Sequence, residues 1–122
     1  MKKLTEQELH NTAMEIVGKQ LEADGFEFMT VNSELKKDPQ FVCLKDKKLH
    51  FIIVRAVHYP NNPLSYDVAL MEKVRAHAEK FEARAYYAGV GLANAQDYEL
   101  PLSQQDAFAI NYQGLKEITL HG

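Results

Sequence analysis

Histidines are the first side chains to consider for metal chemistry, and the chain has five of them. His50 and His58 share one face of an expected strand, but eight residues separate them, roughly 26 Å at ~3.3 Å per residue, so they cannot share an ion. His77 falls beside the apolar stripe of an expected helix. No His-x₃-His or Glu-x-x-His spacing occurs, so we expect no metal site.

The single cysteine, Cys43, limits redox and thiol chemistry. One Cys cannot form an internal disulfide, a four-thiolate zinc site or a Cys-ligated iron–sulfur cluster. Cys43 lies in an apolar segment without a neighbouring His or basic residue that would mark a nucleophile. A buried structural thiol, as in a reducing cytosol, is the expected state.

A glycine-containing segment at 89–94 has the residue types of a phosphate-binding turn. Gly89-Val90-Gly91-Leu92-Ala93-Asn94 follows an expected strand, as in dinucleotide-binding folds, whose glycines let the backbone approach pyrophosphate. The last position is Asn, however, and Pro101 limits any helix after it. A tightly packed strand end is the better interpretation, so we expect no cofactor.

Lysines occur in two expected turns, where they could form a basic patch. Acidic residues interrupt both groups of lysines. Glu34 and Asp38 flank Lys36 and Lys37, and Asp46 lies among Lys45, Lys47 and Lys48. The whole chain has 14 Lys and Arg against 17 Asp and Glu, a net charge of −3. Because phosphate neutralisation needs a basic surplus, solvated turns are favoured over a nucleic-acid surface.

The elements that would position these residues begin with a helix over 6–23. Thr5 and Glu8 have capping-box spacing, and Gly25 closes the segment. Strands follow at 26–32, 40–45 and 49–57, the last two joined as a hairpin through the polar turn 46–48. The apolar run 51–54 suits a central strand covered on both faces.

A second helix is expected to begin near Ser65 to Asp67 and to end near Glu82. Its expected buried stripe consists of Leu70, Met71, Val74, Ala78 and Phe81. A strand at 84–91 follows, and then an edge strand at 107–112 in which Phe108, Ile110 and Tyr112 alternate. This order of elements predicts an α/β fold, that is, an α+β mixed sheet with helices packed on it. We expect a single domain (1–122), with a core at 1–91 and a C-terminal β extension at 92–122.

The framework of the first 90 or so residues resembles the restriction-endonuclease-like fold, in particular the small bacterial family related to Holliday-junction resolvases. Leu21, Gly25, Phe26 and Asn32 match the end of that family's first helix and its first strand. The resemblance implies a core of helix, three strands, helix and strand. It also implies a metal-dependent nuclease site, with Asp on the first hairpin strand and Glu-x-Lys on the second.

The positions of that site carry different residues in this chain. The resemblance places Gln40 at the metal-binding Asp, Ile53 at the Glu and Arg55 at the Lys. The helix Glu of some members falls at Met14, with Glu15 beside it, and Asp38 lies two residues before Gln40. A Mg²⁺ site needs carboxylate oxygens, and Arg cannot act as a base, so we expect a degenerate site without catalytic residues. Asp38 with Pro39 is interpreted as a turn before a strand, and Glu15 and Asp38 as the polar contacts that could remain.

Two interpretations of the strand face with Ile53, Arg55 and Val57 stay open. In one, the apolar side chains fill the old cleft while Arg55 pairs with an acid or reaches solvent. In the other, Arg55 keeps a contact to phosphate or carboxylate. The first is favoured because no wider basic patch surrounds Arg55.

The expected function is that of a non-catalytic, endonuclease-like domain that acts through an unknown protein partner or as a homodimer. Six tyrosines, most of them in the second half, suit an interface, and pairing of the edge strand 107–112 offers a route to a dimer. The alternative is a metal-dependent nuclease or nucleic-acid binder with a rebuilt site. The chain has no apolar stretch of membrane-spanning length and no signal-like N-terminus, so the expected location is cytoplasmic.

A third interpretation is that of an accessory protein named after a subunit of the sodium-pumping NADH–quinone reductase, as short chains of this kind sometimes are. The sequence offers no flavin, nicotinamide or iron–sulfur site for that role. Under that name, we would still expect purified protein without flavin absorbance and without iron.

Overall fold

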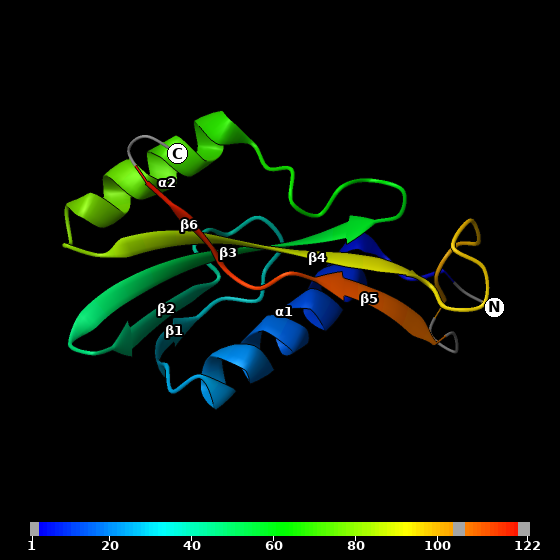
Figure 1. Cartoon of the computed structure of the whole chain (residues 1–122), viewed down its shortest axis with the longest axis horizontal. Coiled ribbons are helices and arrows are strands. Elements are labelled where there is room, and N and C mark those ends of the chain that lie inside the picture. The colour runs from blue at the N-terminus through cyan, green and yellow to red at the C-terminus, as the bar shows by residue number, and fades with distance from the viewer. Residues whose placement is uncertain (1–2, 104–106, 120–122) are drawn as a thin grey trace.

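The computed structural model describes residues 3–103 and 107–119. Two helices and six strands follow one another along the chain (Figure 1): α1 (Glu6–Ala23), β1 (Glu27–Val31), β2 (Phe41–Lys45), β3 (Lys48–His58), α2 (Val68–Glu79), β4 (Arg84–Asn94), β5 (Phe108–Tyr112) and β6 (Lys116–Ile118). The predicted mixed α/β class is confirmed, and the predicted elements occur in the predicted order, but β6 was not predicted.

Helix α1 begins where the sequence predicts. The Thr5 hydroxyl accepts a hydrogen bond from the Glu8 amide at 3.1 Å, and the Glu8 carboxylate accepts one from the Thr5 amide at 2.9 Å. This capping box satisfies two amides that the first helical turn leaves free. After the helix, Gly25 adopts a φ of 87°, a left-handed conformation that glycine tolerates without strain.

The sheet has the order β1-β2-β3-β4-β5, with β6 also paired to β4. Strands β1, β2 and β3 are antiparallel neighbours. Strands β3 and β4 are parallel neighbours, and the crossover that connects them contains α2. β5 and β6 both pair antiparallel with β4, β5 along its second half and β6 along its first. Asp46 and Lys47 form the tight turn of the predicted hairpin, and both have positive φ. Two-residue turns of this kind are favoured in hairpins because their backbone twist matches the right-handed twist of the two strands.

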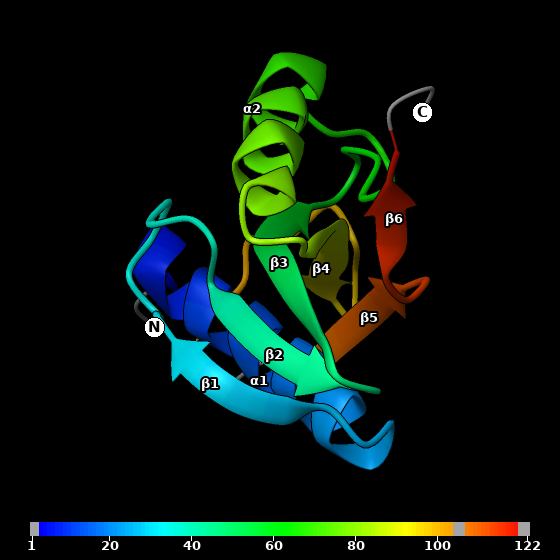
Figure 2. The ribbon, with the colours of Figure 1, turned by 90° about the vertical axis from the view of Figure 1, so that its left-hand side faces the viewer.

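The helices cover opposite faces of the sheet (Figures 1 and 2), so the protein has two hydrophobic clusters. One lies between α1 and the sheet and includes Val17, Leu21 and Ile52. The other lies under α2 and includes Ile53, Met71 and Val74. Residues 51–54 of β3 are all buried, as predicted for a strand covered on both sides.

The prediction for α2 was wrong at its C-terminal end. The helix ends at Glu79, and Phe81 lies beyond it with 53% of its surface exposed, outside the buried stripe. The chain turns at Glu82, which has a φ of 55°, before β4 begins. Asp67 caps the helix by accepting a hydrogen bond from the Leu70 amide at 3.1 Å.

Candidate functional site

Arg55 and Asp38 form the central contact at the degenerate positions. Arg55 lies on β3, and Asp38 lies in the turn that leads to β2. The guanidinium donates from Nη1 to Oδ1 at 2.9 Å and from Nη2 to Oδ2 at 2.8 Å. The two side chains are only 19% and 17% exposed, respectively. This two-point pairing is the strong geometry for an arginine and a carboxylate, and it agrees with the interpretation in which Arg55 pairs with an acid.

Gln40 fixes this ion pair against the sheet. Its Nε2 donates to Asp38 Oδ1 at 2.8 Å and to the Lys37 carbonyl at 3.1 Å. Its Oε1 accepts from the Val54 amide at 2.7 Å. β2 begins only at Phe41, so no strand carbonyl faces Val54 there, and the Gln40 side chain takes that place. The residue at the predicted metal-binding position therefore has a structural hydrogen bond at each end of its amide.

The carboxyl of Asp38 is held in its charged form. Burial would raise its pKa, but the hydrogen bonds from Arg55 and Gln40, together with the positive charge of Arg55, lower the pKa below its usual value. Both oxygens of the ionised carboxylate already accept hydrogen bonds. The interpretation of Asp38 as a simple turn residue was therefore incomplete, since it is also the counterion of Arg55.

The other predicted positions lie outside this network. Ile53 is fully buried in the cluster under α2, and Met14 is buried in the cluster under α1, on the opposite face of the sheet. Glu15 faces solvent and pairs with Lys19 at 3.3 Å along the helix. The structure thus joins Asp38, Gln40 and Arg55 by hydrogen bonds, whereas the side chains of Ile53, Met14 and Glu15 take no part in this network.

His10 is a residue near this network that the sequence analysis missed. It lies on α1 one turn before Met14 and is fully buried. Within the described part of the chain, neither of its ring nitrogens has a hydrogen-bond partner. Burial and the charge of Arg55 lower its pKa, while the charge of Asp38 acts in the opposite direction. Its burial could have been predicted from its spacing, because His10 shares the helical stripe of Ala13, Met14 and Val17.

The glycine-containing segment 89–94 lies within β4 and not in a turn before a helix. A Cβ on Gly89 would lie 1.9 Å from the Pro63 carbonyl oxygen, and one on Gly91 would lie 3.2 Å from Pro63 Cγ. The glycines therefore let the 59–67 connection cross closely over β4. This close packing explains the pattern without a phosphate ligand.

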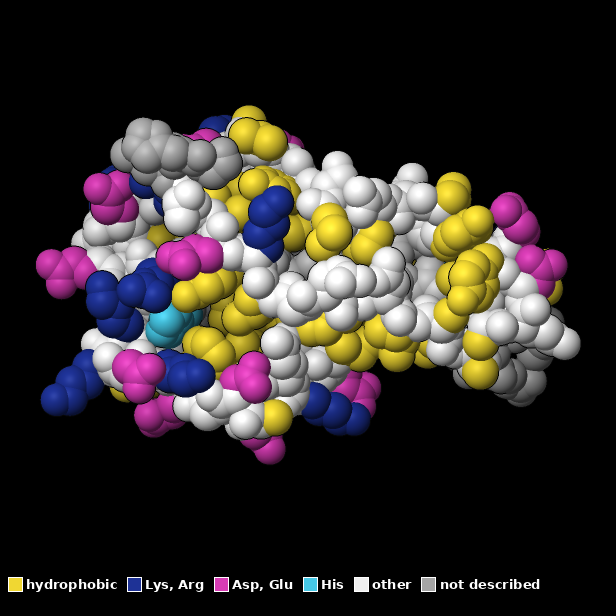
Figure 3. Space-filling model, viewed as in Figure 1, with side chains coloured by type: hydrophobic (Ala, Val, Ile, Leu, Met, Phe, Trp, Pro, Cys, Tyr) yellow, Lys and Arg dark blue, Asp and Glu magenta, His cyan; other side chains and the backbone are white. Residues whose placement is uncertain are grey.

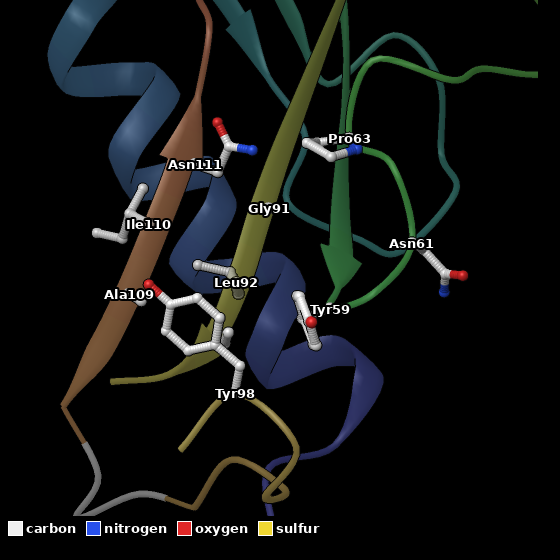
Figure 4. A pocket seen from close by; sticks show the side chains of 10 residues that line it. Tyr59, Asn61, Pro63, Gly91, Leu92, Tyr98, Ala109, Ile110 and Asn111 are labelled. Atoms are coloured by element: carbon white, nitrogen blue, oxygen red, sulfur yellow. The ribbon is translucent and has the colours of Figure 1, made fainter. Parts of the chain in front are cut away.

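The same crossing forms one wall of a groove of about 380 Å³ (Figure 4). Tyr59 and Tyr98 lie at one end, with their ring centroids 5.3 Å apart and the rings packed edge to face. Pro63 and Asn111 approach each other at the other end, and β4 and β5 form the floor. Among the described residues, the groove is lined by aromatic, aliphatic and amide groups, and none of these lining side chains is charged.

The two lysine turns do not combine into one basic patch, and no metal cluster assembles in the described residues. The 36–37 and 45–48 lysines lie at opposite ends of β2, so the two turns do not form one surface. Across 3–103 and 107–119, no three His, Cys, Asp or Glu side chains lie close enough together to hold a metal ion. Cys43 is buried, and burial raises its pKa to about 11, as expected of a structural thiol.

These features define an α/β domain with a mixed sheet, a helix on each face and a partly buried Asp–Gln–Arg network at the start of β2. The model of the family described as "Domain of unknown function (DUF8840)" matches residues 7–118, and the chain belongs to this family. No curated protein and no solved structure matches the chain. Neither described helix is long and apolar enough to cross a membrane.

Proposed function

We propose that this protein is a non-catalytic relative of the restriction-endonuclease-like fold that acts by binding, either to a protein partner or to itself. The observation that carries the proposal is the Asp38–Gln40–Arg55 network. It occupies the hairpin positions at which the resemblance would place a nuclease's metal ligand and lysine.

The contacts of Asp38 support the absence of nuclease chemistry. A Mg²⁺ ion would need at least one of its oxygens, but Arg55 engages both of them and Gln40 engages one a second time. These hydrogen bonds occupy three of the roughly four lone-pair sites of the carboxylate, and a cation at the remaining site on Oδ2 would lie beside the positive charge of Arg55, which repels it. Ile53, at the second ligand position, offers no oxygen in its side chain and is part of the core.

The charge distribution supports binding to protein over binding to nucleic acid. The chain carries an excess of three negative charges, and its lysine turns are separated by the length of β2. A protein that neutralises phosphates needs a continuous basic surface. In contrast, the uncharged groove with Tyr59 and Tyr98 has the composition typical of protein contacts.

Thermal unfolding with Mg²⁺ or Mn²⁺ tests the proposal, in parallel with incubation of the protein with a branched DNA junction. We expect no change in Tm beyond about 1 °C, because an ion that does not bind the native state cannot stabilise it. We also expect no cleavage of the junction. Asp38→Asn is the matched variant, because it removes the one candidate carboxylate.

Three results would overturn the proposal. One is a metal-dependent rise in Tm that Asp38→Asn abolishes. Another is metal-dependent cleavage of the junction. The third is DNA binding that weakens steeply with salt, which would favour the alternative of a nucleic-acid binder.

A further inference from the structure

We propose that the outer edge of β5 pairs antiparallel with β5 of a second copy of this chain, so that the two sheets become continuous across a two-fold axis. This inference names the partner in the proposed binding function and rests on that proposal. Its evidence comes from the backbone direction of β5, its composition and the surface around it.

The backbone of β5 is open on one side. β4 pairs with β5 over Asn94–Val90, and no described residue pairs with the opposite edge. Ala95 donates to the Ala107 carbonyl at 2.9 Å, so the peptide groups of residue 107 face β4. Because peptide direction alternates along a strand, those of Phe108, Ile110 and Tyr112 point away from β4.

The composition of β5 leaves this edge unprotected. Its sequence, Phe-Ala-Ile-Asn-Tyr, contains no charge and no proline, and its register with β4 has no bulge. The opposite edge of the sheet differs, because β1 carries Glu27 and has an irregularity between Phe28 and Thr30. The short β6 carries Lys116 and Glu117. Charges and bulges are the usual devices that block edge pairing, and β5 has neither.

The strand is also complementary to itself. With the two-fold axis at Ile110, this residue faces its own copy and Phe108 faces Tyr112 of the second copy. The outward peptide groups then form three hydrogen-bonded pairs, with about six hydrogen bonds between the strands. Aromatic pairs on either side of an aliphatic pair are favourable cross-strand neighbours. The Tyr112 ring is already held in place, because its hydroxyl donates to Gln20 on α1.

The surface near β5 suits a second copy. Figure 3 shows charged side chains mainly around the helices and the hairpin end of the sheet, whereas the surface over β4 and β5 is mostly uncharged. Charges beside a two-fold axis lie close to their own copies, so charged side chains there would repel each other across the axis. Ile110 is the exposed apolar residue of this strand, with 54% of its surface accessible.

Sedimentation equilibrium of the full chain over a range of concentrations tests the pairing. We expect the wild type to pass from monomer to dimer, and Ile110→Lys to weaken the dimer at least about tenfold, because it places two like charges directly opposite each other. Val31→Lys is the matched control. Val31 lies on the edge strand β1 and is also 54% exposed, so this variant should dimerise as the wild type does.

A cross-link tests the register independently of the effect of a charge. Residues opposite each other in a hydrogen-bonded pair have Cα atoms about 5.5 Å apart, within the range of a disulfide. Ile110→Cys should therefore form a covalent dimer with oxidised glutathione as the oxidant, and Val31→Cys should not. The native Cys43 is buried and does not compete.

The pairing would be overturned by a wild type that stays monomeric up to ~0.5 mM, where even weak association is visible. A dimer that Ile110→Lys leaves intact, or that both lysine variants weaken equally, would also overturn it. A monomer without a metal response would refute the β5 pairing and leave the non-catalytic assignment in place. A metal response that Asp38→Asn abolishes would refute the non-catalytic assignment even if the dimer forms.

Discussion

The side-chain oxygen of Gln40 accepts a hydrogen bond from the backbone amide of Val54 at 2.7 Å, in the place where a longer β2 would supply a carbonyl. The amide lies in the buried part of β3, so it has no access to solvent as a substitute partner. A side chain thus completes the backbone hydrogen bonding of the central strand. The same Gln40 amide also orients Asp38 toward Arg55.

Gln40→Leu is expected to lower the free energy of unfolding by about 1–3 kcal/mol, because it leaves a buried amide without an acceptor. Urea unfolding followed by circular dichroism measures the change. Gln113→Leu, which replaces an exposed amide, is the control and should change stability by less than about 0.5 kcal/mol. A loss for Gln40→Leu no larger than that of the control would contradict the role of this hydrogen bond.

The Asp38–Arg55 pair is expected to show strong coupling. Asp38→Asn and Arg55→Met should each destabilise the protein by about 1–3 kcal/mol, because each leaves a largely buried charge without its partner. The double variant should lose less than the sum of the two single losses. A double-mutant cycle measured by urea unfolding gives the interaction energy, and additive losses would show that the two groups do not interact.

Acid should weaken the fold through Asp38. Its pKa is lowered in the folded protein, so the unfolded chain binds a proton more readily and stability is lost as pH falls below about 4. The stabilisation is fully present above the unfolded pKa. Unfolding free energies measured from pH 6 to pH 2 should therefore fall less steeply in Asp38→Asn than in the wild type, and equal slopes would contradict this assignment.

His10 should make the fold sensitive to a milder acid range. Its pKa is lowered from its ordinary value of 6.5, so the unfolded state binds the proton first and stability falls as pH drops below that value. His10→Leu should keep or increase stability at pH 7.5, because it removes two buried nitrogens that have no hydrogen-bond partner among the described residues. Its advantage over the wild type should grow toward pH 5.

The pH range of His10 overlaps with that of another histidine. Burial also lowers the pKa of His50, so a reduced slope is expected in His10→Leu and not a flat line. Unfolding in urea at pH 7.5 and at pH 5 provides the comparison. An equal loss of stability in the wild type and in His10→Leu would refute the assignment to His10.

The two glycines Gly89 and Gly18 should respond in opposite ways to alanine. In β4, the new Cβ of Gly89→Ala would lie 1.9 Å from the Pro63 carbonyl oxygen, so a loss of at least about 3 kcal/mol is expected. In α1, the Cβ of Gly18→Ala would lie 3.5 Å from Phe41, an ordinary contact, and alanine should add about 0.5–1 kcal/mol. Thermal and urea unfolding measure both, and a tolerated Gly89→Ala would contradict the close crossing of the 59–67 connection.

The elements of this fold could be predicted because their signals are local. Thr5 and Glu8 define the start of α1 within four residues of sequence, and the apolar run 51–54 identifies a strand covered on both faces. Phe81 continued the periodicity of α2, but periodicity alone does not show where a helix ends. The chain had already turned toward β4, which left Phe81 about half exposed, with its ring beside those of Phe51 and His77.

The candidate site could be predicted only in part, because its contacts join distant segments. The positions of Gln40 and Arg55 followed from the resemblance, and the pairing of Arg55 with an acid was one of two open interpretations. That the acid is Asp38 depends on how the turn before β2 folds over β3, and sequence spacing does not define that turn. His10 lies on α1 and approaches the network from that helix. The only sign of its burial in the sequence was its helical spacing.

The contact of Pro63 with Gly89 and Gly91 has a consequence for how the groove can change. One wall of the groove is set by the close approach of Pro63 to the backbone of Gly91, where a Cβ would lie 3.2 Å from Pro63 Cγ, so a larger residue in place of Gly91 would displace this wall. Substitutions that alter the groove while keeping this wall are therefore those of its other lining side chains, among which Tyr59 and Tyr98 are the largest. We expect divergence in binding preference between members of this family to be concentrated in those side chains, beside a wall of constant position.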